Sequence, residues 1–491
     1  MLPLLFSLIT ASAPVENPKV FALVVGNNRA IDESTAPLKF ADDDAVAMHE
    51  LLLEAGARSI LLVNADAETR ALHPIASSVM SPTLTAVNAA WEQLRGELAA
   101  ASTAGPTEFI FFFSGHGDVE HGEGYLALEG ERFTRGMLQK VLGASPAQRN
   151  HVVVDACKAY FAVLSKGVGG RREPYLKPFA NEPNVLGRSG FLLSTSSAGD
   201  SHEWEQYQAG VFSFELRSGL RGSADLDRDG VITYRELGGF LQRANAGIVN
   251  SKFRPDFLVV PPGDSLDQPV LRWPAESTAL KLEGPAAHLY VEAPSGQRVL
   301  ELNRGATASI ALRLPAERPL FVRSADEREE RVLESREPTE LTSLPVSTPS
   351  VSKKGALHLA FTQLFSQSFD ASAIESFGAD YALRARVEPE SPTTRDTVTR
   401  IALFTGLGAA AVTAAGLAVA IERSSITPAT SQRERLSRNE GIAAANVTMA
   451  VGGSVAAAAL GTWLILTLTK PTEPELQLGV SPTGVSVSGR W

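Results

Sequence analysis

The sequence predicts an α/β fold over its first half, and two observations carry this prediction. Continuous apolar runs, which are typical of strands buried on both faces of a parallel sheet, recur along this part of the chain. They alternate with segments whose apolar residues have helical spacing, and this alternation favours a parallel-rich α/β sandwich. The expected strands are residues 20–26, 59–63, 108–113, 151–154 and 190–194.

Helices are expected at residues 41–53, 81–100 and 211–220, between or after these strands. The first begins with three aspartates, Asp42, Asp43 and Asp44, and carboxylates suit the positive end of a helix dipole. In a parallel sheet of this kind, functional groups gather beyond the carboxyl ends of the strands. We therefore expect an α/β domain over residues 17–265 with its site at that edge.

Length and composition limit the classes of protein to consider. A chain of 491 residues suggests two or three domains. With 44% hydrophobic and 20% charged residues, the composition is globular. The net charge of -10 argues against a nucleic acid as partner. The chain has a single cysteine, so it forms no intramolecular disulfide, and the context of that thiol must decide its role.

The second half of the chain has a different pattern. Residues 270–340 contain short alternating runs broken by Pro, Ser and Gly, which predict a small all-β module without a catalytic pattern. Residues 341–400 are expected to be a polar linker with a short helix. The tail, residues 470–491, carries no interpretable motif. Because residues 270–340 lack a catalytic pattern, we interpret the β-module as an interaction or spacer domain.

Two segments, residues 401–421 and 447–468, are long and apolar enough to cross a bilayer as a helical hairpin. Their glycines, Gly406, Gly408, Gly452 and Gly453, would allow close helix contact. The alternative is an Ala-rich hairpin of a soluble protein.

The apolar N-terminus, residues 1–13, resembles a secretory leader that ends in Ala-Ser-Ala, although no Lys or Arg precedes it. The alternative is a frayed apolar terminus. The expected loop between the two spans holds Arg423, Arg433, Arg435 and Arg438, and positive charge favours the cytoplasmic side. The N-terminal α/β domain is then expected on the non-cytoplasmic, periplasmic side. A domain on the cytoplasmic face is the alternative.

His116 and Cys157 are the candidate catalytic residues, because each follows a very apolar strand. Gly115 and Gly117 flank the histidine and let the backbone turn sharply. Two parallel strands that end in His and Cys bring both side chains to one edge of the sheet. Histidine can then take the thiol proton and later protonate a leaving amine. His121 lies in a polar, Gly-rich stretch and is the weaker candidate for the base.

This pairing resembles the caspase and metacaspase clan of cysteine peptidases. The matching residues are Ser-Gly-His-Gly at 114–117 and Asp-Ala-Cys at 155–157, and the spacing of His116 and Cys157 is near the roughly 50 residues expected for caspases. Around the cysteine, the chain has Asp-Ala-Cys-Lys-Ala where animal caspases have Gln-Ala-Cys. The aspartate two positions before the cysteine is similar to that of metacaspases and bacterial caspase-like proteins. The resemblance implies a caspase-like α/β/α sandwich, a Cys-His dyad, and an oxyanion hole from the backbone N–H groups of Gly117 and Cys157.

The resemblance to metacaspases also implies a pocket for a basic substrate side chain. Asp155 matches the acidic residue before the nucleophile, and Asp44 matches an aspartate near the first helix, with Asp43 as an alternative. A carboxylate pair suits a guanidinium or ammonium group, so cleavage after Arg or Lys is expected. Glu203 and Trp204 are weaker candidates for lining this pocket.

The loop after Cys157 contains the basic pair Arg171-Arg172 between glycines. In the caspase clan the corresponding linker is often cut during activation, so a peptidase with basic specificity could process itself there. The alternative is an ordinary solvated loop.

Residues 225–236, DLDRDGVITYRE, match the calcium-binding loop of an EF-hand at every specified position. The sharp turn belongs to Gly230, apolar Ile232 is expected to pack inward, and helical patterns flank the loop on both sides. A polar turn that binds nothing is the alternative. The expected Ca²⁺ ligands are Asp225, Asp227, Asp229, the Val231 carbonyl, Thr233 and Glu236.

These features together predict a membrane-tethered cysteine endopeptidase that acts on proteins or peptides, with calcium bound and no cofactor needed for the chemistry. The alternative is a signalling or scaffold protein whose caspase fold is catalytically idle. The sequence leaves open whether the chain forms homo-oligomers.

Overall fold

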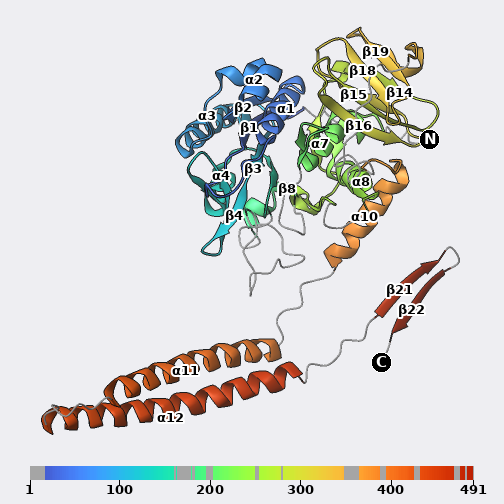
Figure 1. Cartoon of the computed structure of the whole chain (residues 1–491). Coiled ribbons are helices and arrows are strands. Elements are labelled where there is room, and N and C mark those ends of the chain that lie inside the picture. The colour runs from blue at the N-terminus through green and yellow to red at the C-terminus, as the bar shows by residue number, and fades with distance from the viewer. Residues whose placement is uncertain are drawn as a thin grey trace, which may run out of the picture. The chain divides into compact units, whose positions relative to one another are not determined.

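The chain divides into two compact units, residues 1–387 and 388–491 (Figure 1). The expected leader and the loop with Arg171-Arg172 lie outside the described residues. The computed structural model describes residues 17–159, 162, 179, 183–194, 203–248, 254–277, 280–347, 364–386, 394–424, 432–468, 476–481 and 484–489.

A mixed sheet organises the first unit. Among the described residues, six strands lie in the order β12-β8-β7-β3-β1-β2. The pairs β2-β1, β1-β3, β3-β7 and β7-β8 are parallel, and β12 runs antiparallel to β8. The five expected strands are confirmed, whereas the edge strand β12 was not anticipated. The strands are β1 (Lys19–Asn27), β2 (Arg58–Val63), β3 (Thr107–Gly115), β7 (Arg149–Ala156), β8 (Ser189–Ser194) and β12 (Phe257–Val260).

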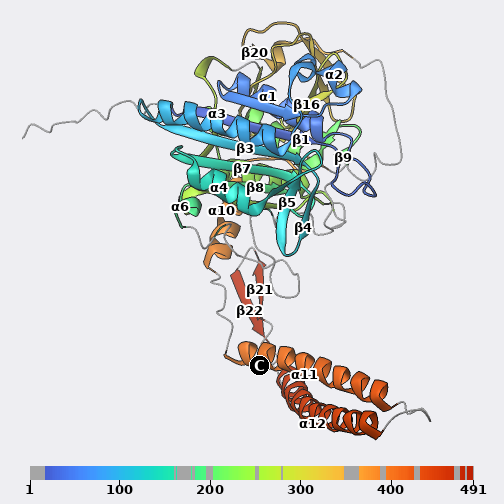
Figure 2. The same cartoon turned by 90° about the vertical axis from the view of Figure 1, so that its left-hand side faces the viewer.

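Helices cover both faces of the sheet, which confirms the α/β/α sandwich (Figure 2). Alternate side chains of β3 enter the two cores, because successive residues of a strand point to opposite faces. Phe109, Phe111 and Phe113 pack with α3 and α4, while Ile110 and Phe112 join the core beneath α1, α7 and α8. The helices are α1 (Ala41–Glu54), α3 (Leu84–Ser102), α4 (Arg135–Ala144), α7 (Val211–Ser218) and α8 (Tyr234–Asn245).

Shorter elements complete this part of the chain. The segment after β3 forms a small antiparallel meander, β4-β5-β6, and a two-strand ribbon, β9-β10, precedes α7. A short π-helical turn, η3 (Gly219–Ser223), follows α7. The other elements are α2 (Ala67–Leu72), η1 (Pro74–Ser78), β4 (Gly117–Glu120), β5 (Glu123–Ala127), β6 (Arg132–Thr134), α6 (Pro183–Leu186), β9 (Glu203–Trp204), β10 (Ala209–Gly210), β11 (Val231–Thr233) and β13 (Pro269–Arg272).

The β-module, expected over residues 270–340, forms two small sheets within residues 280–340, β17-β14-β20 and β16-β15-β18-β19, while β13 pairs with β11 instead. It is part of the first compact unit, since its Leu289 and Leu300 belong to the same apolar core as Phe214 and Leu216 of α7. Its strands are β14 (Leu280–Leu282), β15 (Ala287–Glu292), β16 (Arg298–Arg304), β17 (Ile310–Leu312), β18 (Leu320–Ser324), β19 (Glu330–Leu333) and β20 (Thr339–Glu340). Helix α10 (Ala371–Arg386) packs against α8.

The second unit contains a pair of long helices, α11 (Thr394–Ser424) and α12 (Gln432–Leu468), that pack along each other. Within the described residues, their stretches Ala402–Glu422 and Asn439–Ile465 are long and apolar enough to cross a membrane, with mean hydropathy 1.8 and 1.5. The structure corrects one expectation, because none of the four arginines lies in a loop. Arg423 lies inside α11, and Arg433, Arg435 and Arg438 lie inside α12.

Two of the four glycines expected at the contact of the long helices do lie there. A Cβ on Gly406 would meet Leu460 at 2.7 Å, and one on Gly452 would meet Thr413 at 2.7 Å. A Cβ on Gly453 would reach Thr413 only at 3.9 Å, and Gly408 has no atom within 4 Å of that position. The tail, residues 470–491, carried no interpretable motif, and it contains two antiparallel strands, β21 (Leu476–Ser481) and β22 (Gly484–Gly489).

Candidate active site

His116 and Cys157 leave the sheet side by side. Strands β3 and β7 run parallel and in register, with Gly115 opposite Ala156, and the two candidate residues come next in each strand. The Gly117 backbone touches the Cys157 backbone, because a Cβ on Gly117 would lie 2.5 Å from the Cys157 carbonyl oxygen. The topology therefore brings the expected base, the expected nucleophile and the expected oxyanion-hole residue to one point.

The surroundings of His116 suit a general base. Burial lowers the pKa of the imidazole, against an opposing effect of the Ala36 and Asn28 carbonyls, so the ring is neutral at neutral pH. Its Nε2 is buried and has no hydrogen-bond partner among the described residues. Its main-chain oxygen accepts a hydrogen bond of 2.9 Å from the Ala127 N–H, which fixes the backbone beside the meander.

Cys157 is partly exposed and begins the turn after β7. The next residue, Lys158, has a left-handed backbone with φ 54°, and its ammonium group is paired with the Asp118 carboxylate. This ion pair joins the segment after Cys157 to the segment after His116.

Asp44 and Asp155, the expected substrate-binding residues, come together beside Gly210. A Cβ on Gly210 would lie 2.7 Å from Asp155 Oδ2 and 2.8 Å from Asp44 Oδ2. The Gly210 N–H donates to Asp44 Oδ2 at 2.9 Å, and Ser213 donates to Asp155 Oδ2 from its N–H at 3.1 Å and its hydroxyl at 2.8 Å. Both aspartates are almost fully buried. Burial raises the pKa of Asp44, and the Arg217 guanidinium acts against this effect and favours the charged carboxylate.

Arg217 of α7 was not foreseen in this cluster. Its Nη2 donates to Asp44 Oδ1 at 3.2 Å, and the guanidinium is 5% exposed. The negative charge of Asp44 is therefore already paired with a positively charged side chain of the same protein. The available signal was a pair of charged residues, Glu215 and Arg217, among the apolar residues of the expected helix 211–220.

Glu203 of β9 lies at the edge of the same cluster. Its carboxylate accepts hydrogen bonds from the N–H groups of Lys39 and Phe40, the shortest of 2.8 Å. Burial raises its pKa, and the neighbouring carboxylates Asp155 and Asp42 act in the same direction. Asp43, the alternative to Asp44, is also buried, and its pKa is raised to about 7 by burial and by Asp42. The cluster carries more carboxylates than cations.

The residues expected to hold calcium are partly gathered. Carboxylate oxygens of Asp225, Asp227 and Asp229 lie within 4.8 Å of one another. Asp225 Oδ1 is buried without a hydrogen-bond partner among the described residues, and carboxylate oxygens are the ligands that Ca²⁺ prefers.

The other expected ligands lie around this cluster. Val231 begins β11, and Ile232 is fully buried, as expected. Thr233 and Glu236 bond to each other in a capping box at the start of α8, with Oε2 of Glu236 accepting from the Thr233 N–H and hydroxyl.

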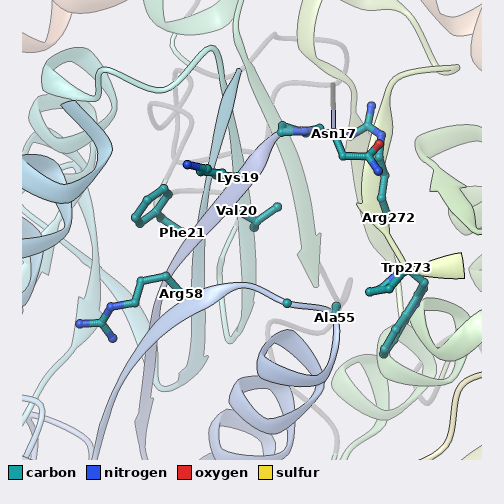
Figure 3. Close-up of a pocket in the computed structure, with 11 residues that line it drawn as sticks. Asn17, Lys19, Val20, Phe21, Ala55, Arg58, Arg272 and Trp273 are labelled. Carbon is teal, nitrogen blue, oxygen red and sulfur yellow. The ribbon is translucent and has the colours of Figure 1, made fainter. Parts of the chain in front are cut away.

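A cavity of about 380 Å³ lies at the opposite edge of the sheet, at the amino end of β1 (Figure 3). It is lined by Asn17, Val20, Ala55, Arg272 and Trp273, among others. In Figure 3 the Arg58 side chain points away from Trp273, and Arg58 is paired with Glu97. Because His116 and Cys157 follow the carboxyl ends of their strands, this cavity is separate from the candidate active site.

These features define a mixed α/β/α domain with a histidine and a cysteine at the carboxyl ends of neighbouring parallel strands. Residues 19–251, just under half of the chain, match the family model of the caspase domain, so this part of the chain is a caspase-like domain.

Two solved structures are similar to the chain. Caspase-1 from Spodoptera frugiperda shares 14% identity over 48% of this chain and 82% of its own, with a TM-score of 0.31. The structure titled pro-sf-caspase-1 shares 13% identity over 55% of this chain and 93% of its own, with a TM-score of 0.30. The search of curated proteins finds no match.

Proposed function

We propose that the chain is a cysteine endopeptidase in which Cys157 is the nucleophile and His116 the general base. The observation that carries this proposal is the parallel register of β3 and β7, with Gly115 opposite Ala156. It makes His116 and Cys157 the next residues on two adjacent strands. The caspase-domain match over residues 19–251 supports the same assignment.

In the proposed reaction, His116 takes the proton from the Cys157 thiol, and the thiolate sulfur attacks the scissile carbonyl carbon. The N–H groups of Gly117 and Cys157 stabilise the resulting oxyanion. The imidazolium then gives its proton to the leaving amine, so that the C–N bond breaks and a thioester remains. Water hydrolyses the thioester and restores the thiol.

The proposed preference is for Arg or Lys before the scissile bond. Asp155 and Glu203 would supply the net negative charge, since Asp44 already has Arg217 beside it. A charged substrate group that is taken from water needs an opposite charge to compensate its desolvation. The two long apolar helices support attachment of the peptidase to a membrane, which we include in the proposal.

We also propose that the loop 225–236 binds one Ca²⁺ ion. The match of the loop to the EF-hand pattern supports this, as do the three gathered aspartates and the unpartnered Oδ1 of Asp225. Asp225, Asp227 and Asp229 would hold the ion first, with the Val231 carbonyl, Thr233 and Glu236 as further ligands. The ion would stabilise the turn between α7 and α8.

The test is cleavage of fluorogenic peptides with Arg, Lys or Asp before the scissile bond by the detergent-solubilised full chain. We expect cleavage after Arg and Lys, and none by Cys157→Ala or His116→Ala. His121→Ala is the matched control and should keep the activity. Cleavage that survives Cys157→Ala contradicts the assignment of the nucleophile, and cleavage after Asp alone contradicts the acidic pocket. Parallel assays with Ca²⁺ and with a chelator show whether activity depends on the ion.

A further inference from the structure

The β-module reaches the proposed calcium loop through one buried arginine. Arg313, the residue after β17, is 5% exposed, and its Nη1 donates to Asp225 Oδ2 at 2.7 Å. Asp225 itself is fully buried. The first residue of the loop therefore has as its charged partner a side chain that lies 88 positions further along the chain.

The two oxygens of Asp225 have different surroundings. Oδ2 accepts hydrogen bonds from Arg313 and from the Gly230 N–H, the latter at 3.2 Å. Oδ1 is buried without a hydrogen-bond partner among the described residues and is the oxygen that remains for a metal ion. An ion on Oδ1 and the guanidinium on Oδ2 would not compete for the same atom.

Arg313 is itself held in place from two sides. Its main-chain N–H donates to the Arg221 carbonyl at 2.8 Å, and Arg221 Nη1 donates back to the Arg313 carbonyl at 3.2 Å. Nη1 of Arg313 also donates to the Ala311 carbonyl at 2.7 Å. The guanidinium is therefore fixed against η3, which leads into the loop, and against β17 of the β-module.

We propose that Arg313 is a positioning residue that orients Asp225 for Ca²⁺, so that the ion and the docked β-module stabilise each other. This inference rests on the proposed calcium site. Groups that hydrogen-bond to a metal ligand fix its orientation, and their removal typically weakens metal binding by 10–100-fold, in order of magnitude. Because binding free energies are reciprocal, an ion that prefers the oriented Asp225 also favours the docked position of Arg313.

The test is a calcium titration of the detergent-solubilised full chain by calorimetry, for the wild type, Arg313→Gln and Arg228→Gln. Arg228 is the matched control because it lies in the same loop and also contacts the module, but through exposed partners, Glu283 and Ser309. We expect Arg313→Gln to raise the dissociation constant for Ca²⁺ by about 10–100-fold. Arg228→Gln should change it by less than about threefold, since exposed ion pairs contribute little.

Terbium luminescence gives a second readout. The main-chain N–H of Trp273 donates to the Gly230 carbonyl at 2.8 Å, and its indole N–H donates to the Leu220 carbonyl of η3 at 2.7 Å. The indole therefore lies beside the segment that leads into the loop, from where it can sensitise a bound Tb³⁺ ion. Arg313→Lys keeps the charge but loses the fork of donors, and it should fall between the wild type and Arg313→Gln. If Arg313→Gln does not fold, the ion affinity of Arg313→Lys is compared with that of the wild type, and a weaker affinity of Arg313→Lys supports the inference.

An unchanged or tighter affinity in the Arg313 variants overturns the inference, because it would mean that the guanidinium is irrelevant to the ion or opposes it. Failure of the wild type to bind either ion removes this inference together with the calcium site. That result leaves the peptidase proposal untouched, because the titration does not measure cleavage. Peptide cleavage by the same preparations then reports on the peptidase proposal separately.

Discussion

Arg217 and Asp44 form a buried ion pair, with 3.2 Å between Nη2 and Oδ1 and exposed fractions of 5% and 1%. The pair joins α7 to the first turn of α1 next to the candidate substrate pocket. Because the two charges are held away from water, the loss of one partner leaves the other without compensation.

Arg217→Leu should strongly destabilise the first unit. It leaves the Asp44 carboxylate buried beside Asp155, and breaking a buried pair in this way costs about 3–5 kcal/mol. The matched control is Arg235→Leu, which breaks the more exposed pair of Arg235 with Asp267 and should cost less than about 1 kcal/mol. The measurement is the free energy of unfolding in denaturant. Equal small losses in both variants would show that Arg217 does not compensate Asp44.

The two aspartates of the cluster should differ in their effect on substrate selection. Asp155→Asn should lower kcat/KM for an Arg substrate by about 10–100-fold, since a charge-assisted hydrogen bond is worth about 1.5–3 kcal/mol. Asp44→Asn should have a smaller effect, because Arg217 already neutralises that carboxylate. Measurements of kcat/KM with matched Arg and Gln peptides show which of the two substitutions has the larger effect. A larger effect of Asp44→Asn would show that the substrate displaces Arg217.

Gly210→Ala should reduce activity and stability together. The added Cβ would lie 2.7 Å and 2.8 Å from the carboxylate oxygens of Asp155 and Asp44, both of which are buried. Gly96→Ala is the matched control: it lies within helix α3, has no atom within 4 Å of the added Cβ, and should stabilise by about 0.5–1 kcal/mol. Melting temperature and peptide cleavage measure both variants. Wild-type activity in Gly210→Ala would place the substrate pocket elsewhere.

Asp43 should make the stability of the first unit depend on pH. Burial and the Asp42 charge raise the pKa of this carboxyl from 3.8 to about 7, so the folded state retains a proton that the unfolded state has released. Stability is then lost as the pH rises from about 4 to about 7, by a few kcal/mol in order of magnitude. Asp43→Asn should therefore raise the melting temperature at pH 8 and change it little at pH 4. An equal change at both pH values would contradict a raised pKa.

The sequence predicted the five parallel strands because each is a continuous apolar run. Strand β12, FLVV, is just as apolar but only four residues long, and no local pattern tells which edge of a sheet such a segment joins or in which direction. The β4-β5-β6 meander was missed because its strands are short and half-exposed. Pairing partners are set by contacts distant in sequence, so local periodicity does not identify them.

For the site, strand order was enough to place His116 beside Cys157, and the resemblance to metacaspases pointed to Asp44 and Asp155. Arg217 was not expected because its partner lies 173 residues earlier, and only the packing of α7 against α1 brings them together. Arg313 was missed for the same reason, since its contact with Asp225 spans 88 residues. A charged residue in an apolar helix or strand indicates that an oppositely charged partner lies nearby in the fold, but the sequence does not show which residue that partner is.

The core shared by α7 and the β-module also determines where the chain can be cut without harm. A cut near residue 265 would strip Leu289 and Leu300 from Phe214 and Leu216, and the remaining fragment would present a bare apolar surface to water. A cut between residues 387 and 388 separates the two compact units and leaves that core whole. Release of the caspase-like domain from its long helices in an intact form therefore requires that the β-module leave with it.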